Sequence, residues 1–162
     1  MVEEVIRAED IELVVDYRTT WQEMMRFASF DWCNPDILEK NFPLPESMLG
    51  KSVSLSGKIF GFSSEVSSAN VIEECRKQNC RPANLAELFV LAQIQPGLKK
   101  RFPVVALGSV YAGPIRFCDY GYYVPVMNVD GRQPGRRLNL MSYDCEWETY
   151  FRFLVIDNPR KI

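Results

Sequence analysis

The sequence predicts a single α+β domain, and three observations indicate this class. Helical periodicity of apolar residues is confined to the stretch 20–95. From residue 104 onward, short runs alternate apolar and polar residues, which is typical of strands. Apolar segments suited to a buried sheet lie near both ends, at 11–17 and 151–156. Helices followed by a series of strands are characteristic of α+β domains.

The composition is that of an ordinary globular protein with a core large enough to fold unaided. The chain has 162 residues, of which 47% are hydrophobic and 25% are charged. These values match one domain of common size. We therefore expect one domain over residues 1–162, with a β-rich half at 104–156. A chain of this length buries roughly two-thirds of its unfolded surface, so it needs no disulfide to stay folded.

The first expected elements are a strand and a helix. Within 11–17, Leu13, Val15 and Tyr17 would face the same side of a strand. Thr20 and Glu23 have the spacing of a capping box, which predicts that a helix begins here. Its apolar stripe follows the i, i+3, i+4, i+7 rule and consists of Trp21, Met24, Met25 and Ala28.

One strand and two more helices complete the first half. Residues 53–62 have the composition of a strand, although Gly57 would weaken it. A second helix is expected over 68–79. A third begins at Asn84, because Asn84 and Glu87 repeat the capping-box spacing. The inward face of the second helix should consist of Val71, Ile72 and Cys75.

The second half should be built of short strands. The expected strands cover 104–111, 122–127, 136–140 and 151–156, with a turn at 130–131. We expect the strand near the amino terminus, 13–17, to pair directly with the last strand and so bring the termini together. The helices would then pack on a small, twisted antiparallel sheet.

Charge and composition argue against several classes of function. The chain has 19 basic and 21 acidic residues and a net charge of −2. No strong basic field therefore exists to attract nucleic acid or an anionic membrane. Histidine is absent, which removes the usual general base near neutral pH and the commonest metal ligand. We expect no metal, no cofactor and no catalytic residues.

Cysteine usage and the amino terminus indicate where the chain is made. Five cysteines at irregular spacing indicate reduced thiols. Cys75 and Cys80 lack the second ligand pair of a zinc site, and they would form a local bridge only outside the cell. The first residues are acidic, and no apolar run is long enough to span a bilayer. We expect synthesis in the cytoplasm without a signal peptide. The chain should be a monomer, because no heptad or assembly segment is present.

The most informative segment is a polar-aromatic run at 141–150, which lies between two apolar alternating segments. It is rich in Tyr, Ser, Asp, Cys and Thr, the residue types of recognition surfaces, and it contains neither histidine nor a glycine loop. A second segment of the same character lies at 111–123. This composition indicates a surface that binds a ligand rather than one that transforms it.

Three segments resemble C-type lectin-like proteins. The segment RPANLAEL at 81–88 is similar to the start of a helix in that family, with departures at Ala83 and Asn84. The segment FPVVALGSVY at 102–111 resembles the strand that follows this helix. The segment W-x4-RFLVI at 147–156 resembles the terminal strand.

More narrowly, nearly the whole chain from residue 16 onward is similar to the variable proteins of diversity-generating retroelements in archaeal viruses and small-genome prokaryotes. In that family a reverse transcriptase rewrites adenines in a carboxyl-terminal repeat, and the altered residues line a ligand-binding face. The resemblance implies a C-type lectin-like fold that needs no calcium, and a protein or cell-surface ligand. It leaves open whether the chain is virion-associated, on a cell surface or in the cytoplasm.

The genetic code indicates which residues would vary. Asn codons altered at their adenines can yield Ser, Tyr, Asp, Cys, Thr and Phe, among others, but never Trp, Glu or Met. The first candidates are Ser142, Tyr143, Asp144, Cys145, Thr149, Tyr150 and Phe151. The second group consists of Tyr111, Ala112, Cys118 and Tyr120. Trp147 would be a fixed structural anchor between the variable loop and the last strand.

Several alternatives stay open at this point. A viral interaction protein with a fixed surface would carry the same residues, and any single tyrosine could be an ordinary half-buried aromatic. An enzyme of the formylglycine-generating or carbohydrate-active kind would use Cys118 and Cys145, or a carboxylate pair. Calcium would need several oxygen ligands in a closed loop. Six charged residues are instead expected to be solvated and to have no site role: Asp144, Glu146, Glu148, Arg132, Arg136 and Arg137.

Overall fold

The structure, a computed structural model, confirms the mixed α+β class. It describes residues 5–95, 102–116, 118–128 and 135–159. The helices are α1 (Trp21–Ala28), α2 (Ser68–Lys77) and α3 (Leu85–Ile94), with a short 3-10 helix, η1 (Glu46–Met48). The expected turn at 130–131 and Arg132 lie outside the described residues.

The strands form one large mixed sheet and one small pair. Their bounds are β1 (Val5–Asp16), β2 (Trp32–Cys33), β3 (Ser52–Phe62), β4 (Val66–Ser67), β5 (Cys80–Pro82), β6 (Val104–Val105), β7 (Tyr111–Ile115), β8 (Cys118–Asn128), β9 (Arg137–Ser142), β10 (Glu146–Trp147) and β11 (Arg152–Asp157). Among the described residues the large sheet runs β1-β3-β11-β6-β8-β9-β2, with β5 beside β11 and β7 beside β8. Strands β10 and β4 pair separately.

The expected pairing of the first and last strands is wrong, because β3 lies between them. Strand β1 pairs with β3 along its length, and β3 pairs with β11. Gly57 explains the close approach of β3 to β11: a Cβ at this position would lie only 2.4 Å from the backbone oxygen of Val155. Gly57, which was expected to weaken β3, therefore allows the backbone of β11 to approach it closely.

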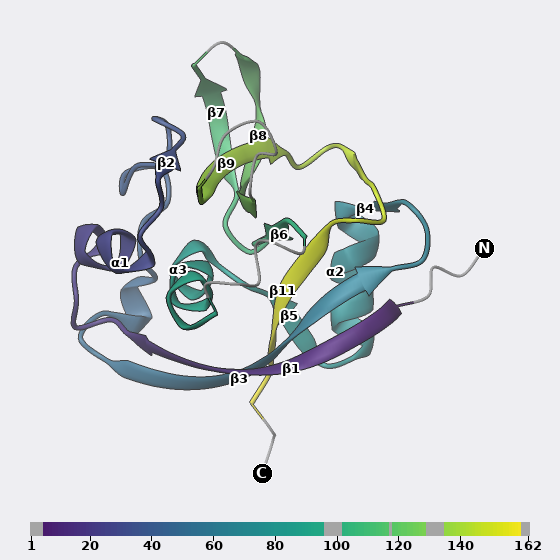
Figure 1. Cartoon of the computed structure of the whole chain (residues 1–162), viewed down its shortest axis with the longest axis horizontal. Coiled ribbons are helices and arrows are strands. Elements are labelled where there is room, and N and C mark those ends of the chain that lie inside the picture. The colour runs from purple at the N-terminus through teal and green to yellow at the C-terminus, as the bar shows by residue number, and fades with distance from the viewer. Residues whose placement is uncertain (1–4, 96–101, 117, 129–134, 160–162) are drawn as a thin grey trace.

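The sheet is also larger than expected and is not purely antiparallel. Strand β11 pairs with β6 in the parallel sense, and β2 pairs with β9 in the same sense. Figure 1 shows β1 and β3 side by side as a long curved pair of strands. Helices α1 and α3 lie on its concave side, and α2 lies near β11 and β5. The expected strand at 104–111 is wrong over 106–110: only β6 lies within it, and β7 begins at its last residue.

Helix starts agree closely with the capping signals. Thr20 and Asn84 each complete a capping box, with Glu23 and Glu87 as the returning side chains. Ser67 caps α2 by accepting a bond from the backbone of Asn70. The helix interiors agree less fully. Val71 and Cys75 of α2 are buried, but Ile72 is exposed because it lies on the side of the helix away from the sheet.

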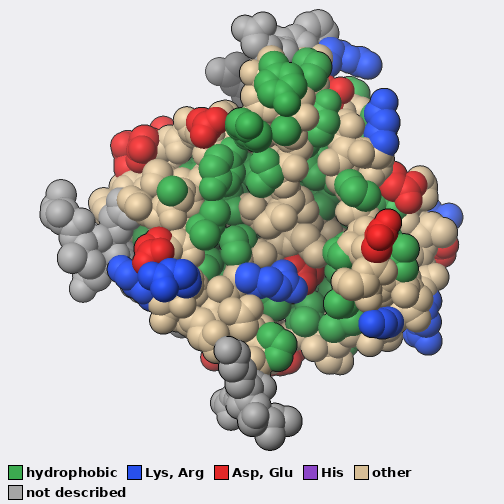
Figure 2. Space-filling model, turned by 180° about the vertical axis from the view of Figure 1, so that it is seen from behind, with side chains coloured by type: hydrophobic (Ala, Val, Ile, Leu, Met, Phe, Trp, Pro, Cys, Tyr) green, Lys and Arg blue, Asp and Glu red, His purple; other side chains and the backbone are tan. Residues whose placement is uncertain are grey.

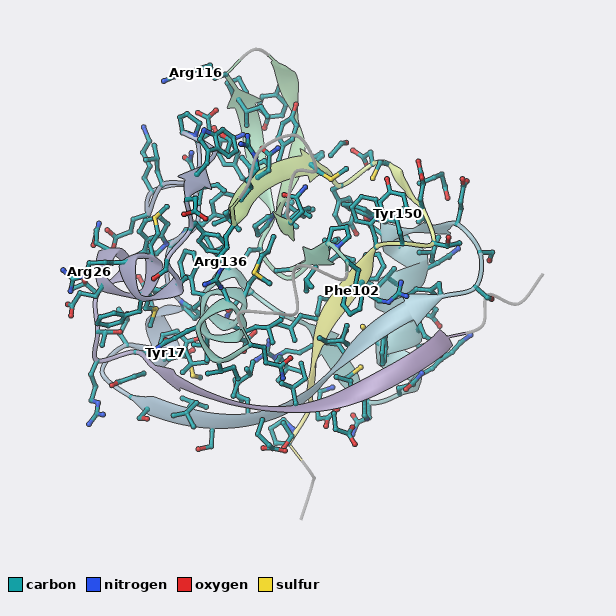
Figure 3. All side chains as sticks on the ribbon, viewed as in Figure 1. Tyr17, Arg26, Phe102, Arg116, Arg136 and Tyr150 are labelled. Atoms are coloured by element: carbon teal, nitrogen blue, oxygen red, sulfur yellow. The ribbon has the colours of Figure 1, made fainter. Side chains whose placement is uncertain are left out.

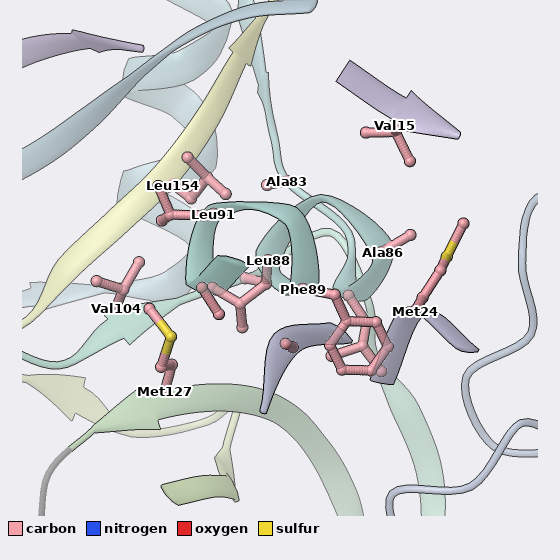
Figure 4. Packing of buried hydrophobic residues seen from close by; sticks show 14 of the residues in the cluster. Val15, Met24, Ala83, Ala86, Leu88, Phe89, Leu91, Val104, Met127 and Leu154 are labelled. Atoms are coloured by element: carbon pink, nitrogen blue, oxygen red, sulfur yellow. The ribbon is translucent and has the colours of Figure 1, made fainter. Parts of the chain in front are cut away.

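Two hydrophobic clusters occupy the two faces of β11. Leu154 and Ile156 belong to the first cluster, whereas Phe153 and Val155 belong to the second. Figure 4 shows α3 inside the first cluster, with Leu88 and Leu91 near residues of the sheet. The second cluster lies between the sheet and α2, and its largest member is Trp147. Because both faces of β11 are covered, the last strand is a rigid base for the loop that precedes it.

Candidate functional site

The polar-aromatic run leaves the large sheet where β9 ends. The backbone N–H of Tyr143 donates to the carbonyl of Tyr122 on β8 over 2.8 Å, and this bond is the last of the β8–β9 pairing. The chain then crosses to α2, where β10 pairs with β4. It returns through residues 148–151 to β11. Figure 3 shows Tyr150 on this returning loop.

Trp147 holds the loop to the core. Its side chain is 0% exposed, as expected of a structural residue, and its ring centroid lies 4.9 Å from that of Phe151. The indole N–H donates to the hydroxyl of Ser68 over 2.8 Å, and that hydroxyl donates to the carbonyl of Tyr143 over 2.7 Å. The buried Ser68 at the start of α2 therefore links residues 143 and 147, which are the two ends of the first half of the loop. Sequence reasoning missed Ser68, since nothing in its local pattern marks it.

We predict that Ser68→Ala destabilises the protein and loosens this loop. Alanine leaves the indole N–H of Trp147 and the carbonyl of Tyr143 without their partner. An unsatisfied buried polar group costs about 1–3 kcal/mol, and we expect the free energy of unfolding to fall by about 2 kcal/mol. Urea titration measures the change. Ser67→Ala, one residue away, removes a helix cap but leaves the loop bonds intact, so a larger effect at 67 than at 68 would contradict this role of Ser68.

Arg152 supports the second half of the loop. Its guanidinium donates to the carbonyls of Thr149 over 2.8 Å and Phe151 over 3.1 Å, and it lies 4.9 Å from the ring of Phe102. A turn is closed by the N–H of Phe151, which donates to the carbonyl of Glu148 over 3.1 Å. The side chains of Thr149 and Tyr150 are therefore exposed on a turn whose main chain is fixed.

The candidate residues differ in exposure. Exposed side chains belong to Ala112, Tyr120, Ser142, Asp144, Thr149 and Tyr150, and half-buried ones to Tyr111, Tyr143 and Cys145. Phe151 is only 7% exposed and packs in the second cluster, so its assignment to the exposed surface is corrected. Its ring is buried because it packs edge-on against Trp147. Cys118 begins β8, and its side chain lies outside the described residues.

The structure also separates the candidates onto two faces of the sheet. Tyr111 pairs with Tyr123 and packs with it against the first cluster. Its hydroxyl donates to the carbonyl of Pro114 over 3.1 Å, and its ring lies 6.1 Å from that of Phe42. Ser142 is opposite Tyr123 and thus faces the same way. Tyr111 and Ser142 are therefore not beside the other candidates, because neighbouring strand residues point to opposite faces.

The remaining tyrosines border the second cluster, and we call Tyr120, Tyr122, Tyr143 and Tyr150 the tyrosine face. Tyr122 is 49% exposed and lies on the same face of β8 as the buried Val124. Tyr120 is 69% exposed and precedes it, at a register shift in the β7–β8 pairing. Tyr143 packs partly against the second cluster, and Tyr150 stacks on Phe151 with ring centroids 4.7 Å apart. Figure 2 shows hydrophobic side chains gathered at the hairpin end of the molecule.

Tyr122 is a residue of this face that lies in the predicted polar-aromatic segment at 111–123 and in a predicted strand, but it was not among the candidate binding residues. The period of two in Tyr120, Tyr122 and Val124 could have revealed it. This alternation predicts one side of a strand, and Tyr120 was already a candidate. The sequence pattern does not show that Tyr122 is exposed, because exposure depends on where β9 ends. Strand β9 ends beside Tyr122 and leaves the first half of β8 without a neighbouring strand on that side.

The described titratable groups of the loop are one thiol, two phenols and three carboxylates. Burial raises the pKa of the Cys145 thiol, which favours its protonated form. Burial, and secondarily the charge of Glu148, raises the pKa of the Tyr150 hydroxyl. Asp144, Glu146 and Glu148 are all exposed. Within the described ranges, no group of three or more Cys, Asp or Glu residues could hold a metal ion.

The arginines near the β8–β9 connection have structural contacts. Arg136 donates to the carbonyl of Ala92 at the end of α3, and its guanidinium lies 5.7 Å from the ring of Phe30. The guanidinium of Arg137 lies 4.2 Å from the ring of Trp32. These contacts replace the expected description of Arg136 and Arg137 as solvated edge charges.

Two hollows of about 540 and 680 Å³ are both lined in part by Arg81 and Asn84, and neither is lined by a residue of the tyrosine face. Comparisons of the chain with protein-family models, with curated proteins and with solved structures find no match. In the part of the chain that the structure describes, no helix is long and apolar enough to cross a membrane.

Proposed function

We propose that this chain is a binding protein that recognises a protein or cell-surface ligand through the tyrosine face and the polar side chains beside it. Exposed tyrosines supply large, rigid contact area at low cost in side-chain entropy. Asp144 and Thr149, both exposed, supply adaptable hydrogen bonds. No step of this function requires a general base, a metal or a cofactor.

The observation that carries the proposal is how the loop is held. Ser68 bonds to the carbonyl of Tyr143, and Arg152 bonds to the carbonyls of Thr149 and Phe151. These are main-chain groups, which every amino acid has. These hydrogen bonds therefore do not depend on the side chains at 143 and 149, whereas the hydroxyl of the exposed Ser142 accepts from the backbone N–H of Asp144 over 3.2 Å. A loop held in this way can change the exposed side chains of Asp144, Thr149 and Tyr150 and keep these main-chain bonds.

We further propose that the fold is C-type lectin-like and that this loop is diversified by a retroelement. Exposure and codon chemistry support the idea together. Glu146 and Trp147, which adenine changes cannot produce, form β10 and anchor the loop. Asp144, Thr149 and Tyr150, which such changes can produce, are exposed. Phe151 is also within reach of adenine changes, but it is buried, and we assign it to the fixed frame.

The nucleotide sequence around the coding region tests this diversification. We expect a near-copy of the segment that encodes residues 142–150, with differences confined to adenines, beside a reverse transcriptase gene. The differing codons should include those of Asp144, Thr149 and Tyr150 and should spare that of Trp147. Differences spread evenly over all codons, or no near-copy at all, would leave a binding protein with a fixed surface and would end the retroelement proposal.

At the protein level, we predict that Tyr122, Asp144 and Tyr150 can be replaced together by alanine with little loss of stability. All three are exposed, and surface substitutions of this kind usually change stability by about 0.5 kcal/mol or less each. The melting temperature should fall by only a few degrees in a thermal scan. Phe151→Ala is the matched control, because it lies next to Tyr150 but is buried. A drop for the triple variant as large as that of the control would contradict the surface assignment.

A further inference from the structure

The larger of the two hollows, which we call the β3 pocket, lies where the large sheet lacks a strand. Strand β11 pairs with β3 only from Gly57 to Phe60. Strand β3 continues to Ser52 and stays paired with β1 along its other edge. The pocket is lined by residues 53–56 of β3 and by residues 156–159, and so lies beside the part of β3 that β11 does not reach. Its volume of about 680 Å³ is typical of small-molecule sites.

The walls of the β3 pocket include apolar side chains that are incompletely covered. Val53 and Leu55 are opposite Val15 and Leu13, so all four lie on the same face of the sheet. Val15 and Leu13 are 0% and 1% exposed, whereas Val53 and Leu55 are only half-buried. We attribute this difference to the pocket, which Val53 and Leu55 both line. An apolar molecule in the pocket would take their remaining surface out of water.

Tyr17 supplies the pocket with a buried hydrogen-bond donor. Its side chain lines the pocket and is only 4% exposed. Figure 3 shows Tyr17 on the concave side of β1 and β3. The hydroxyl accepts from the side-chain amide of Asn84 over 3.5 Å, and within the described part of the chain no residue accepts the proton of this hydroxyl. Burial raises the pKa of the Tyr17 hydroxyl, so the hydroxyl keeps that proton and can donate it.

The charged groups of the pocket are already paired. Three charged residues line it in the described structure, and each has an ionic partner. The guanidinium of Arg81 donates to both carboxylate oxygens of Glu87, at 2.9 and 2.7 Å. The carboxylate of Asp157 lies 3.4 Å from the ammonium group of Lys58. A charged ligand would lose its hydration without gaining a free counter-charge, so the pocket favours a neutral ligand.

We propose that the β3 pocket binds a small, neutral, largely apolar molecule whose carbonyl or ether oxygen accepts a hydrogen bond from the Tyr17 hydroxyl. The apolar body of the ligand would lie against Val53, Leu55 and Met48, which line the same pocket. This combination of apolar walls with a single directed polar group is typical of small-molecule sites. No residue of the tyrosine face lines the pocket, so this site does not depend on the proposed function.

Equilibrium dialysis with model compounds tests the class of ligand. Benzophenone is neutral and apolar and carries one carbonyl oxygen, and 2-benzoylbenzoate adds a carboxylate beside that carbonyl. Benzophenone should bind saturably at one site per chain. The anion should bind at least about tenfold more weakly, because its carboxylate would be desolvated without a counter-charge. Absence of saturable benzophenone binding, or equal binding of the anion, would overturn the proposal.

Tyr17→Phe tests the hydrogen bond, because it removes the hydroxyl and keeps the ring. Diphenylmethane is the matched compound, since it has the two rings of benzophenone without the oxygen. The affinity of the variant for benzophenone should fall about fivefold, the size of one lost hydrogen bond, and its affinity for diphenylmethane should not change. A general distortion of the pocket would weaken both compounds equally. Equal losses, or no loss for benzophenone, would contradict the proposal.

Photochemical cross-linking of the wild-type chain locates the compound without any substitution. Under near-ultraviolet light the carbonyl of benzophenone inserts into nearby C–H bonds, and mass spectrometry should find the adduct on Met48 or Leu55. Leu55→Trp, which fills the pocket, should lower the affinity at least about tenfold. Val14→Trp, on the opposite face of the sheet, should leave it unchanged. Adducts confined to residues outside the pocket, or full affinity in a folded Leu55→Trp variant, would overturn the proposal.

Discussion

Replacing Trp147 by alanine is expected to lower the free energy of unfolding by about 3–5 kcal/mol, the usual cost of removing a fully buried large aromatic side chain. The indole is 0% exposed and contacts the rings of both Phe151 and Phe153. Its removal opens a cavity in the second cluster. It also removes the indole N–H that donates a hydrogen bond to the hydroxyl of Ser68.

Chemical denaturation of wild-type and variant chains measures this change. Trp147→Phe is the informative comparison, because it keeps a six-membered aromatic ring in the second cluster but loses the N–H that donates to Ser68. We expect it to cost less than half as much as the alanine variant. An alanine variant as stable as the wild type would mean that the loop does not depend on this anchor, and the proposal of a fixed frame beneath changeable side chains would then fail.

The helices were the most predictable part of this fold. Their starts are encoded locally, since Thr20 with Glu23 and Asn84 with Glu87 satisfy backbone groups within one turn. The order of strands was less accessible. Pairing between β3 and β11 depends on contacts about a hundred residues apart, as between Phe60 and Phe153. No local pattern records which of several apolar strands will lie beside another.

The candidate site was predictable in composition but not in arrangement. The polar-aromatic run at 141–150 begins at the end of β9 and includes β10, and within it Asp144 and Tyr150 are exposed whereas Trp147 is buried. Tyr111 and Phe151 have the same codon chemistry, yet one packs against the first cluster and the other in the second. Residue type alone could not separate them, because burial depends on which face of a strand each occupies. Ser68 was invisible for the same reason, since its two partners lie more than seventy positions away along the chain.

The ion pair at the start of α3 is expected to have the second large effect on stability. Glu87 has a side chain only 1% exposed, and it accepts from Arg81 through both carboxylate oxygens, at 2.9 and 2.7 Å. It also accepts from the backbone N–H of Asn84 over 2.8 Å. One buried carboxylate therefore caps the helix and fixes β5 against it.

Arg81→Met should lower the free energy of unfolding by about 3 kcal/mol. Removing one partner of a buried pair typically costs about 3–5 kcal/mol, and we expect the lower end because the side chain of Arg81 is 42% exposed. The reason is the carboxylate of Glu87, which stays buried without its counter-charge. Denaturant titrations of Arg81→Met, Glu87→Met and the double variant form a cycle that isolates the pair.

The double variant decides whether the charge itself or the helix cap dominates. If the stranded carboxylate causes the loss, adding Glu87→Met to Arg81→Met removes the unpaired charge, and the double variant should be no less stable than the single arginine variant. If the cap dominates, losing the bond to Asn84 should lower stability further by about 1 kcal/mol. A cycle in which the two single changes simply add would show that the pair has no net coupling and would contradict its role at the start of α3.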